Sequence, residues 1–130
     1  MGLGRPLERL QLPKSILIVD DSPAIRKSLQ LTLEDHGWQV CGEAVNGREG
    51  VEKALQLKPD LVVLDLAMPV MNGIEAAHEL RRLLPSVTML MFTSFETDGL
   101  KQLALAAGVN AIVSKSHSVD LLVSSVRQLL

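Results

Sequence analysis

Carboxylates, a hydroxyl and an amine each stand at the end of an apolar run in this chain. These groups are Asp20 with Asp21, Asp65, Thr93 with Ser94, and Lys115. Crowded carboxylates repel one another, and a hard divalent ion such as Mg²⁺ relieves the conflict while keeping positions for water and phosphate oxygens. An aspartate beside such an ion can attack a phosphoryl group, while an amine and a hydroxyl meet the charge on its oxygens. If the fold brings these groups together, the chemistry they predict is phosphoryl transfer to a carboxylate.

The run at residues 61–64 predicts the strand on which this arrangement depends. Four consecutive apolar residues follow Pro59 and Asp60, lead into Asp65, and are stopped by Pro69. The run is too short for a helix and shows no alternation, so it indicates a parallel strand buried on both faces. Ligands of such sheets bind just beyond the carboxyl ends of the strands, which is where Asp65 would stand.

The remaining chain alternates between strand and helix patterns. Strands are predicted at residues 15–19, 38–44, 61–64, 87–92 and 110–113. The helices between and after them have predicted N-caps at Ser22, Asn46, Asn72 and Ser118, with one more helix at about residues 97–107. The helix that begins at Asn46 has a predicted buried stripe of Val51, Ala54 and Leu55. Five such units predict an α/β fold, a flavodoxin-like doubly wound parallel sheet of five strands in the order 2-1-3-4-5 with five helices.

Composition limits the class of protein. The chain has 130 residues, 47% of them hydrophobic and 2% aromatic, with a formal net charge of −2 and one cysteine. These values predict one domain with an aliphatic core, no nucleic-acid-binding face, no internal disulfide and no membrane segment, in the cytoplasm. Residues 1–14 are expected to be a flexible leader before a domain at 15–130, although Leu3, Leu7 and Leu10 have the spacing of a short docking helix.

Residues 65–73, Asp-Leu-Ala-Met-Pro-Val-Met-Asn-Gly, resemble the phosphoacceptor loop of the receiver domains of two-component response regulators. Residues 18–22 are similar to the acidic pair of that family, residues 92–94 to its hydroxyl position, and residues 113–115 to its lysine. The resemblance covers about residues 15–130. It implies the same fold that the alternation of strands and helices predicts.

The resemblance also implies a role for each site residue. Asp65 would be the phosphoacceptor, Thr93 would follow the phosphoryl group as a switch, and Lys115 would pair with it. The implied Mg²⁺ ligands are Asp21 directly, Asp20 largely through water, Asp65 itself and the backbone carbonyl of Ala67. The donor would be a histidine kinase or a histidine phosphotransfer protein, and the recipient of the signal a downstream protein target or an output domain absent from this chain. Phosphorylation could also produce a homodimer, and no enzymatic activity is expected beyond the domain's own phosphorylation and dephosphorylation.

Departures from the family pattern leave alternatives open. Ile112 stands where the family often has an aromatic residue, which favours a receiver-like partner-binding module with a degenerate switch as the second hypothesis. Ser116 replaces a common proline, and Ala67 and Phe95 are apolar at positions that modulate dephosphorylation. A phosphatase would need a second acid at position 67. Residues 103–115 are similar to receivers that precede DNA-binding domains, so the chain could also be the N-terminal receiver of a transcriptional regulator.

Overall fold

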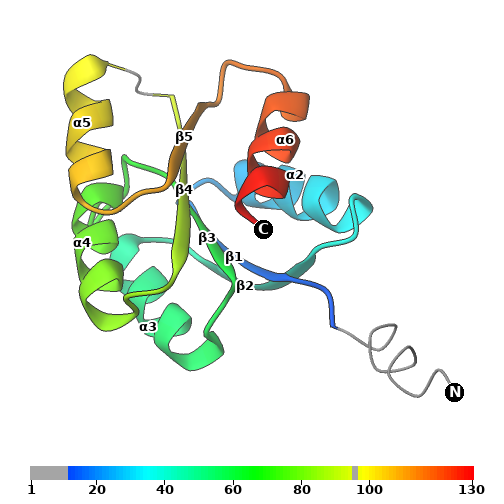
Figure 1. Cartoon of the computed structure of the whole chain (residues 1–130), viewed down its shortest axis with the longest axis horizontal. Helices are drawn as coiled ribbons and strands as arrows, with labels where there is room; N and C mark the ends of the chain where they lie inside the picture. Colours follow the sequence, from blue (N-terminus) through cyan, green and yellow to red (C-terminus); the bar gives the residue numbers. More distant parts are fainter. Residues whose placement is uncertain (1–11, 95–96) are drawn as a thin grey trace, which may run out of the picture.

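A computed structural model describes residues 12–94 and 97–130, and it contains one parallel sheet of five strands (Figure 1). The spatial order is β2-β1-β3-β4-β5, as predicted. The strands are β1 (Ser15–Val19), β2 (Gln39–Ala44), β3 (Leu61–Leu64), β4 (Thr88–Thr93) and β5 (Ala111–Ser114). The predicted leader falls mainly on residues 1–11, outside the described part, and residues 12–14 belong to no helix or strand.

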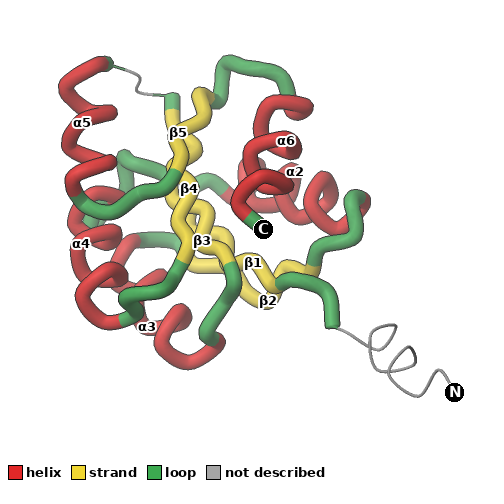
Figure 2. Tube along the Cα trace, in the orientation of Figure 1, coloured by secondary structure: helices red, strands yellow, loops and turns green. Residues whose placement is uncertain are grey.

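Five helices of the described chain cover the sheet on both faces. They are α2 (Pro23–Asp35), α3 (Gly47–Leu57), α4 (Gly73–Leu83), α5 (Asp98–Ala106) and α6 (Val119–Leu129). Helices α2 and α6 lie on one face, and α3, α4 and α5 lie on the other (Figure 2). Each face has its own apolar core, because successive side chains of a strand point to opposite sides of the sheet. Leu17 and Val19 pack toward α3 and α4, whereas Ile16 and Ile18 pack toward α2 and α6.

Helix starts follow local side-chain chemistry. Ser22, Asn46, Asn72 and Thr97 each accept a hydrogen bond from the backbone N–H three residues later. Ser118 occupies the N-cap position of α6, but its side chain makes no capping hydrogen bond, so the predicted cap is wrong in that detail. These caps set where each helix begins relative to the strand before it, and thus fix the short loops at the carboxyl edge of the sheet.

The central strand β3 is fully buried, as the apolar run at residues 61–64 predicted. All four residues of β3 are at most 2% exposed. The prediction that Leu55 of α3 is buried is wrong, because this side chain is 40% exposed. Helix α5 buries only Ala104 among its residues, so its contact with the body is a narrow seam of small side chains and its leucines need not turn inward.

Strand register decides how the loops meet. Val19 of β1 lies opposite Leu64 of β3, and Thr93 of β4 lies opposite Ser114 of β5. Residues that follow these strands therefore leave the sheet in neighbouring positions at one edge. None of the helices in the described ranges is long and apolar enough to span a membrane.

Candidate functional site

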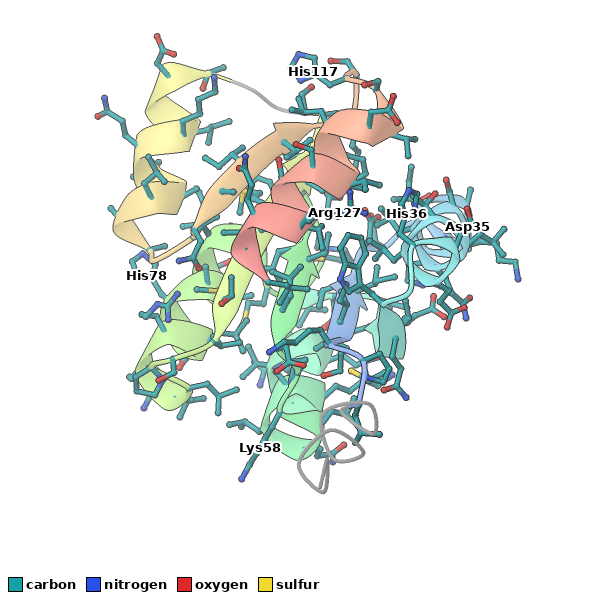
Figure 3. All side chains as sticks on the ribbon, turned by 45° about the vertical axis from the view of Figure 1, so that its right-hand side comes forward. Asp35, His36, Lys58, His78, His117 and Arg127 are labelled. Atoms are coloured by element: carbon teal, nitrogen blue, oxygen red, sulfur yellow. The ribbon has the colours of Figure 1, made fainter. Side chains whose placement is uncertain are left out.

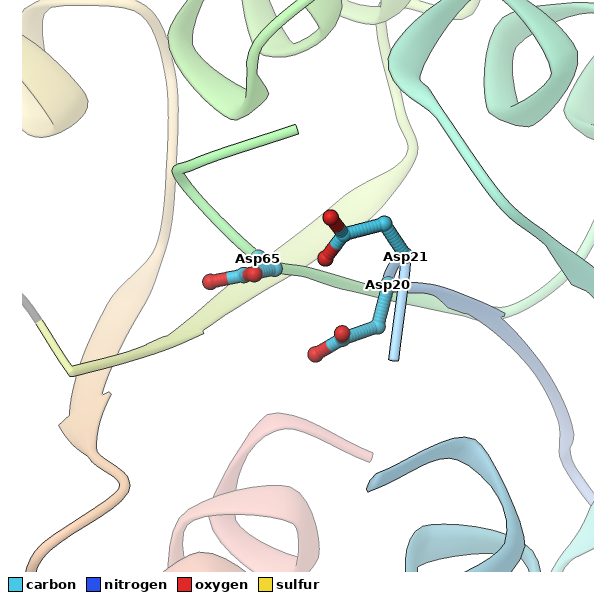
Figure 4. A group of neighbouring side chains, drawn as sticks. All are labelled: Asp20, Asp21 and Asp65. Carbon is cyan, nitrogen blue, oxygen red and sulfur yellow. The ribbon is translucent and has the colours of Figure 1, made fainter. Parts of the chain in front are cut away.

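Three carboxylates gather at the carboxyl edge of the sheet. Asp20 and Asp21 follow β1, Asp65 follows the neighbouring strand β3, and one oxygen from each lies within 4.8 Å of the others (Figure 4). Asp20 and Asp65 are 2% and 6% exposed, whereas Asp21 is exposed. The arrangement follows from the matched register of β1 and β3, which carries both strand ends to the same level.

Lys115 reaches these carboxylates from the end of β5. Its ammonium nitrogen lies 2.9 Å from Asp20 Oδ2 and 3.3 Å from Asp65 Oδ2. The same nitrogen lies 5.9 Å from the centre of the Phe92 ring, within the range of a cation–π contact. The backbone N–H of Lys115 donates to the carbonyl of Thr93 at 2.9 Å. This bond holds the hydroxyl-bearing residue and the lysine side by side at the edge of the sheet, where Thr93 is only 1% exposed.

The surroundings of Asp65 change the pKa of its carboxyl group. Burial raises its pKa above the ordinary value, and the negative charge of Asp20 raises it further. Lys115 and the N–H of Leu66, which donates to Asp65 Oδ1 at 2.8 Å, lower the pKa but do not offset the first two causes. Burial of the carboxyl group is thus the main cause of the raised pKa, and Lys115 offsets it only in part.

The loop after β3 is held tightly against the Asp65 backbone. The N–H of Gly73 donates to the carbonyl of Leu66 at 2.9 Å, which closes the loop. A Cβ atom at position 73 would lie 2.2 Å from the Asp65 carbonyl oxygen, so only glycine fits there. The loop is also fastened to α3, because the N–H of Gly47 donates to the carbonyl of Met71 at 2.9 Å.

Val70 stands in the same loop with an unfavourable backbone conformation. Its φ is +69°, a left-handed region that β-branched residues rarely adopt. Its side chain is 71% exposed, so packing does little to offset the strain. The loop that follows Asp65 therefore has a strained backbone at Val70, and burial of the valine side chain does not compensate for the strain.

The donor set fits a hard divalent cation. Asp20, Asp21 and Asp65 offer carboxylate oxygens, the ligands that Mg²⁺ prefers. The three carboxylates carry more formal negative charge than the Lys115 ammonium balances, and a divalent cation would neutralise the excess. Ala67, whose carbonyl is the fourth predicted ligand, is an exposed residue of the loop that follows Asp65. Its role stays a prediction.

Comparison with known proteins supplies the family. The model of the response regulator receiver domain matches residues 16–127. The chain belongs to this family. The receiver assignment made from residues 65–73 and the other strand ends is thereby confirmed.

Relatives place the receiver domain in different settings. The chemotaxis protein CheY of Thermotoga maritima is 38% identical over 102 residues, which cover 78% of this chain and 85% of CheY. A protein-glutamate methylesterase/protein-glutamine glutaminase of Alkalilimnicola ehrlichii is 43% identical over 102 residues, which cover 76% of this chain and 26% of that protein. The structure of a DNA-binding response regulator of the LuxR family from Staphylococcus aureus matches with a TM-score of 0.84 and 26% identity, covering 89% of this chain and 98% of that one. The chain thus spans most of CheY but only about a quarter of the esterase.

The histidines do not gather into a second site. His36, His78 and His117 are well separated on the molecule (Figure 3). Ile112 is half-buried and packs against the core on the α3 and α4 side, and Ser116 bonds to Ser114 through their hydroxyls at 2.7 Å. Phe95 lies outside the described residues.

Sequence reasoning missed a set of charged residues behind the acid pair. The Arg26 guanidinium donates to the carbonyl of Asp20 at 2.7 Å and pairs with Glu43 at 3.0 Å. Lys53 donates to the Glu43 carbonyl and pairs with Glu49 at 3.0 Å. A usable signal for Arg26 was its place one turn into α2, since helical side chains lean toward the N-terminus and therefore toward the end of β1. No local signal pointed to Glu43, because its contact spans 17 residues.

Proposed function

We propose that this receiver domain accepts a phosphoryl group on Asp65 from a histidine kinase or a histidine phosphotransfer protein, with Mg²⁺ bound by the acid cluster. The observation that carries the proposal is the position of Lys115, within 3.3 Å of Asp65, beside two further carboxylates. An aspartate that only formed a turn would have no reason to be buried beside two other carboxylates and to pair with a lysine, as Asp65 is.

Each residue has a distinct task in the proposed reaction. An Oδ atom of Asp65 attacks phosphorus, the bond from phosphorus to the donor atom breaks, and the donor leaves with that electron pair. Lys115 follows the charge from the Asp65 carboxylate onto the phosphoryl oxygens, and Thr93 approaches from the end of β4. Bound Mg²⁺ would supply neutralisation of the phosphoryl oxygens, held by Asp20, Asp21, Asp65 and the carbonyl of Ala67.

The output that we propose is a change of the surface over α5, β5 and α6. Thr93 and Lys115 stand at the ends of β4 and β5, and the Lys115 N–H is bonded to the Thr93 carbonyl. A displacement of either residue would therefore move β5, the strand that lies between α5 and α6. Leu103 and Leu105, which are 55% and 56% exposed on α5, supply apolar area to that surface for a downstream protein or for a second phosphorylated copy.

Phosphorylation by acetyl phosphate in the presence of Mg²⁺ tests the proposal. The wild-type protein should gain the mass of one phosphoryl group, and Asp65→Asn should gain none. With beryllofluoride and Mg²⁺, amide chemical shifts should change at the site and along α5, β5 and α6. Equal labelling of both proteins would contradict the assignment of Asp65. Shift changes confined to the acid cluster would contradict the proposed output surface.

The alternatives predict different results in the same measurements. A partner-binding module with a degenerate switch, suggested by Ile112, would show no response to beryllofluoride. A phosphatase would hydrolyse small phosphoesters over many turnovers, for which Ala67 offers no second acid. We infer a signalling protein of the cytoplasm, consistent with the single free cysteine. The similarity to a DNA-binding regulator of the LuxR family keeps the N-terminal receiver of a transcriptional regulator as a further alternative.

A further inference from the structure

The peptide group that joins the two acids is held from behind by an arginine. The carbonyl of Asp20 belongs to the Asp20–Asp21 peptide, and Arg26 Nη1 donates to it at 2.7 Å. The orientation of that peptide plane determines the direction in which the Asp21 side chain leaves the backbone. Because the peptide is planar, a bond to its carbonyl fixes the whole unit.

The two acids differ in how they are held. Asp20 is fixed at four points: its N–H donates to the Ala44 carbonyl, its Oδ1 accepts from the Ser22 N–H, its Oδ2 pairs with Lys115, and its carbonyl accepts from Arg26. The Asp21 carboxylate, by contrast, has no hydrogen-bond or ion-pair partner among residues 12–94 and 97–130. The position of the Asp21 carboxylate therefore depends on its backbone, and that backbone depends on Arg26.

The arginine is itself fixed in place. Its Nε lies 3.0 Å from Glu43 Oε1, at the end of β2, and its side chain is only 16% exposed. Lys53 of α3 donates to the carbonyl of the same Glu43. One planar guanidinium thus bridges β2 and the β1–α2 loop, a geometry that a lysine ammonium cannot reproduce with both partners.

We propose that Arg26 is a positioning residue for the Mg²⁺ site, holding the Asp20–Asp21 peptide so that both carboxylates face Asp65, with Glu43 orienting its guanidinium. This inference rests on the proposed function, since it concerns the same ion. Residues behind the ligands of a metal commonly change metal affinity by 10-fold to 100-fold when they are replaced.

A role through geometry and a role through charge predict opposite signs. Arg26 is a cation bonded to the Asp20 backbone, so removing its charge alone would make the surroundings of the site more negative and strengthen Mg²⁺ binding. Removing its hydrogen bond frees the Asp20–Asp21 peptide and weakens binding, because the ion must then order that peptide itself. Arg26→Met removes both charge and bond, and Arg26→Lys keeps the charge but loses the planar fork.

Titration of the full chain with Mg²⁺ alone, followed by calorimetry, tests the inference. Arg26→Met should weaken Mg²⁺ binding by about tenfold, and Arg26→Lys should also weaken it. The amide of Ser22, which donates to Asp20 Oδ1 at 2.9 Å, should exchange faster with solvent in both variants before any Mg²⁺ is added. Arg82→Met is the matched control, since it breaks the exposed pair with Glu79 on α4 and should leave Mg²⁺ affinity unchanged.

The role of Glu43 is tested by a double-mutant cycle. Glu43→Gln should weaken Mg²⁺ binding in the wild-type background and have no further effect once Arg26 is methionine, because Glu43 acts through the arginine. Additive effects would overturn that part of the proposal. Far-UV circular dichroism verifies that each variant is folded, and Arg26→Lys keeps the test decisive if Arg26→Met does not fold.

The results separate this inference from the proposed function. If the wild-type protein binds Mg²⁺ and is phosphorylated, but Arg26→Met and Arg26→Lys bind the ion as tightly as wild type or more tightly, the positioning role is wrong and the phosphoacceptor role stands. If the wild-type protein neither binds Mg²⁺ nor reacts with acetyl phosphate, the proposed function itself fails. Weaker binding in both arginine variants, with the Arg82→Met control unchanged, supports the positioning role.

Discussion

The ammonium of Lys115 lies 3.3 Å from Asp65 Oδ2 in a site that is closed to most solvent. The same ammonium lies 2.9 Å from Asp20, so one cation is shared between two carboxylates. Because the pKa of Asp65 is nonetheless raised, the repulsion and burial of the acids exceed what the lysine offsets. Before any ligand arrives, the three carboxylates carry more formal charge than the Lys115 ammonium that pairs with two of them.

Replacing Lys115 by methionine should separate its two effects. Mg²⁺ should bind at least about fivefold more tightly, since a unit charge at about 4 Å is worth about 1 kcal/mol even with the screening of bulk water. Phosphorylation of Asp65 by acetyl phosphate should fall by about 10²-fold to 10³-fold, because the charge on the phosphoryl oxygens is no longer met. Calorimetry and mass spectrometry measure the two quantities. Lys27→Met, an exposed position on α2, is the control, and weaker Mg²⁺ binding in Lys115→Met would contradict the argument.

Asp65→Asn should stabilise the protein at neutral pH in the absence of Mg²⁺. The pKa of Asp65 is higher in the folded state than its ordinary value of 3.8, so the folded protein binds the proton more tightly than the unfolded chain. The wild-type protein therefore loses unfolding free energy as pH rises through that window, and the asparagine variant does not. Urea unfolding of both proteins at several pH values gives the difference, which should grow in favour of the variant between about pH 4 and about pH 7. A difference that shrinks over this range would show that the pKa is lowered instead.

Val70→Asn should raise the unfolding free energy by about 1 kcal/mol, because asparagine tolerates the left-handed backbone at this position. The exposed valine side chain contributes little packing that the change could remove. Urea unfolding measures the gain, and Mg²⁺ affinity should stay within about twofold of wild type, since the ligand residues are unchanged. Val45→Asn, at another exposed valine whose φ is not positive, is the control and should give no gain. A destabilised Val70→Asn would indicate that the valine makes contacts that outweigh the strain.

Gly73→Ala should displace the backbone of the phosphoacceptor. The added Cβ would lie 2.2 Å from the Asp65 carbonyl oxygen, so the loop or helix α4 must shift. We expect a loss of about 2–4 kcal/mol of unfolding free energy, the range of steric changes in packed interiors, together with weaker Mg²⁺ binding. Gly99→Ala in α5 meets no atom within 4 Å and should stabilise the protein by about 0.5–1 kcal/mol. Similar effects of the two substitutions would rule out the close approach at Asp65.

Local sequence determined the strands, the helix starts and the strand-end groups. The apolar run at residues 61–64 is too short for a helix and can only be a buried parallel strand. Helix caps such as Ser22 and Asn72 act on backbone groups within three residues, so they too can be identified from local sequence. Parallel strands joined by helices can only expose their carboxyl ends at one edge, so the meeting of Asp20, Asp65, Thr93 and Lys115 follows from topology. The burial of Leu55 was predicted wrongly, because helical spacing gives a face but not the width of its contact.

Only the tertiary structure decided how the acids are held. The shared Lys115 ammonium, the bond from Arg26 to the Asp20 carbonyl and the pair with Glu43 join segments that periodicity and capping rules do not relate. The strained backbone of Val70 likewise depends on how a loop closes between two fixed elements. The spacing of residues along the chain identifies the groups that can react. The distances and angles between those groups depend on how all the helices and strands pack, and they determine the electrostatics and geometry of the site.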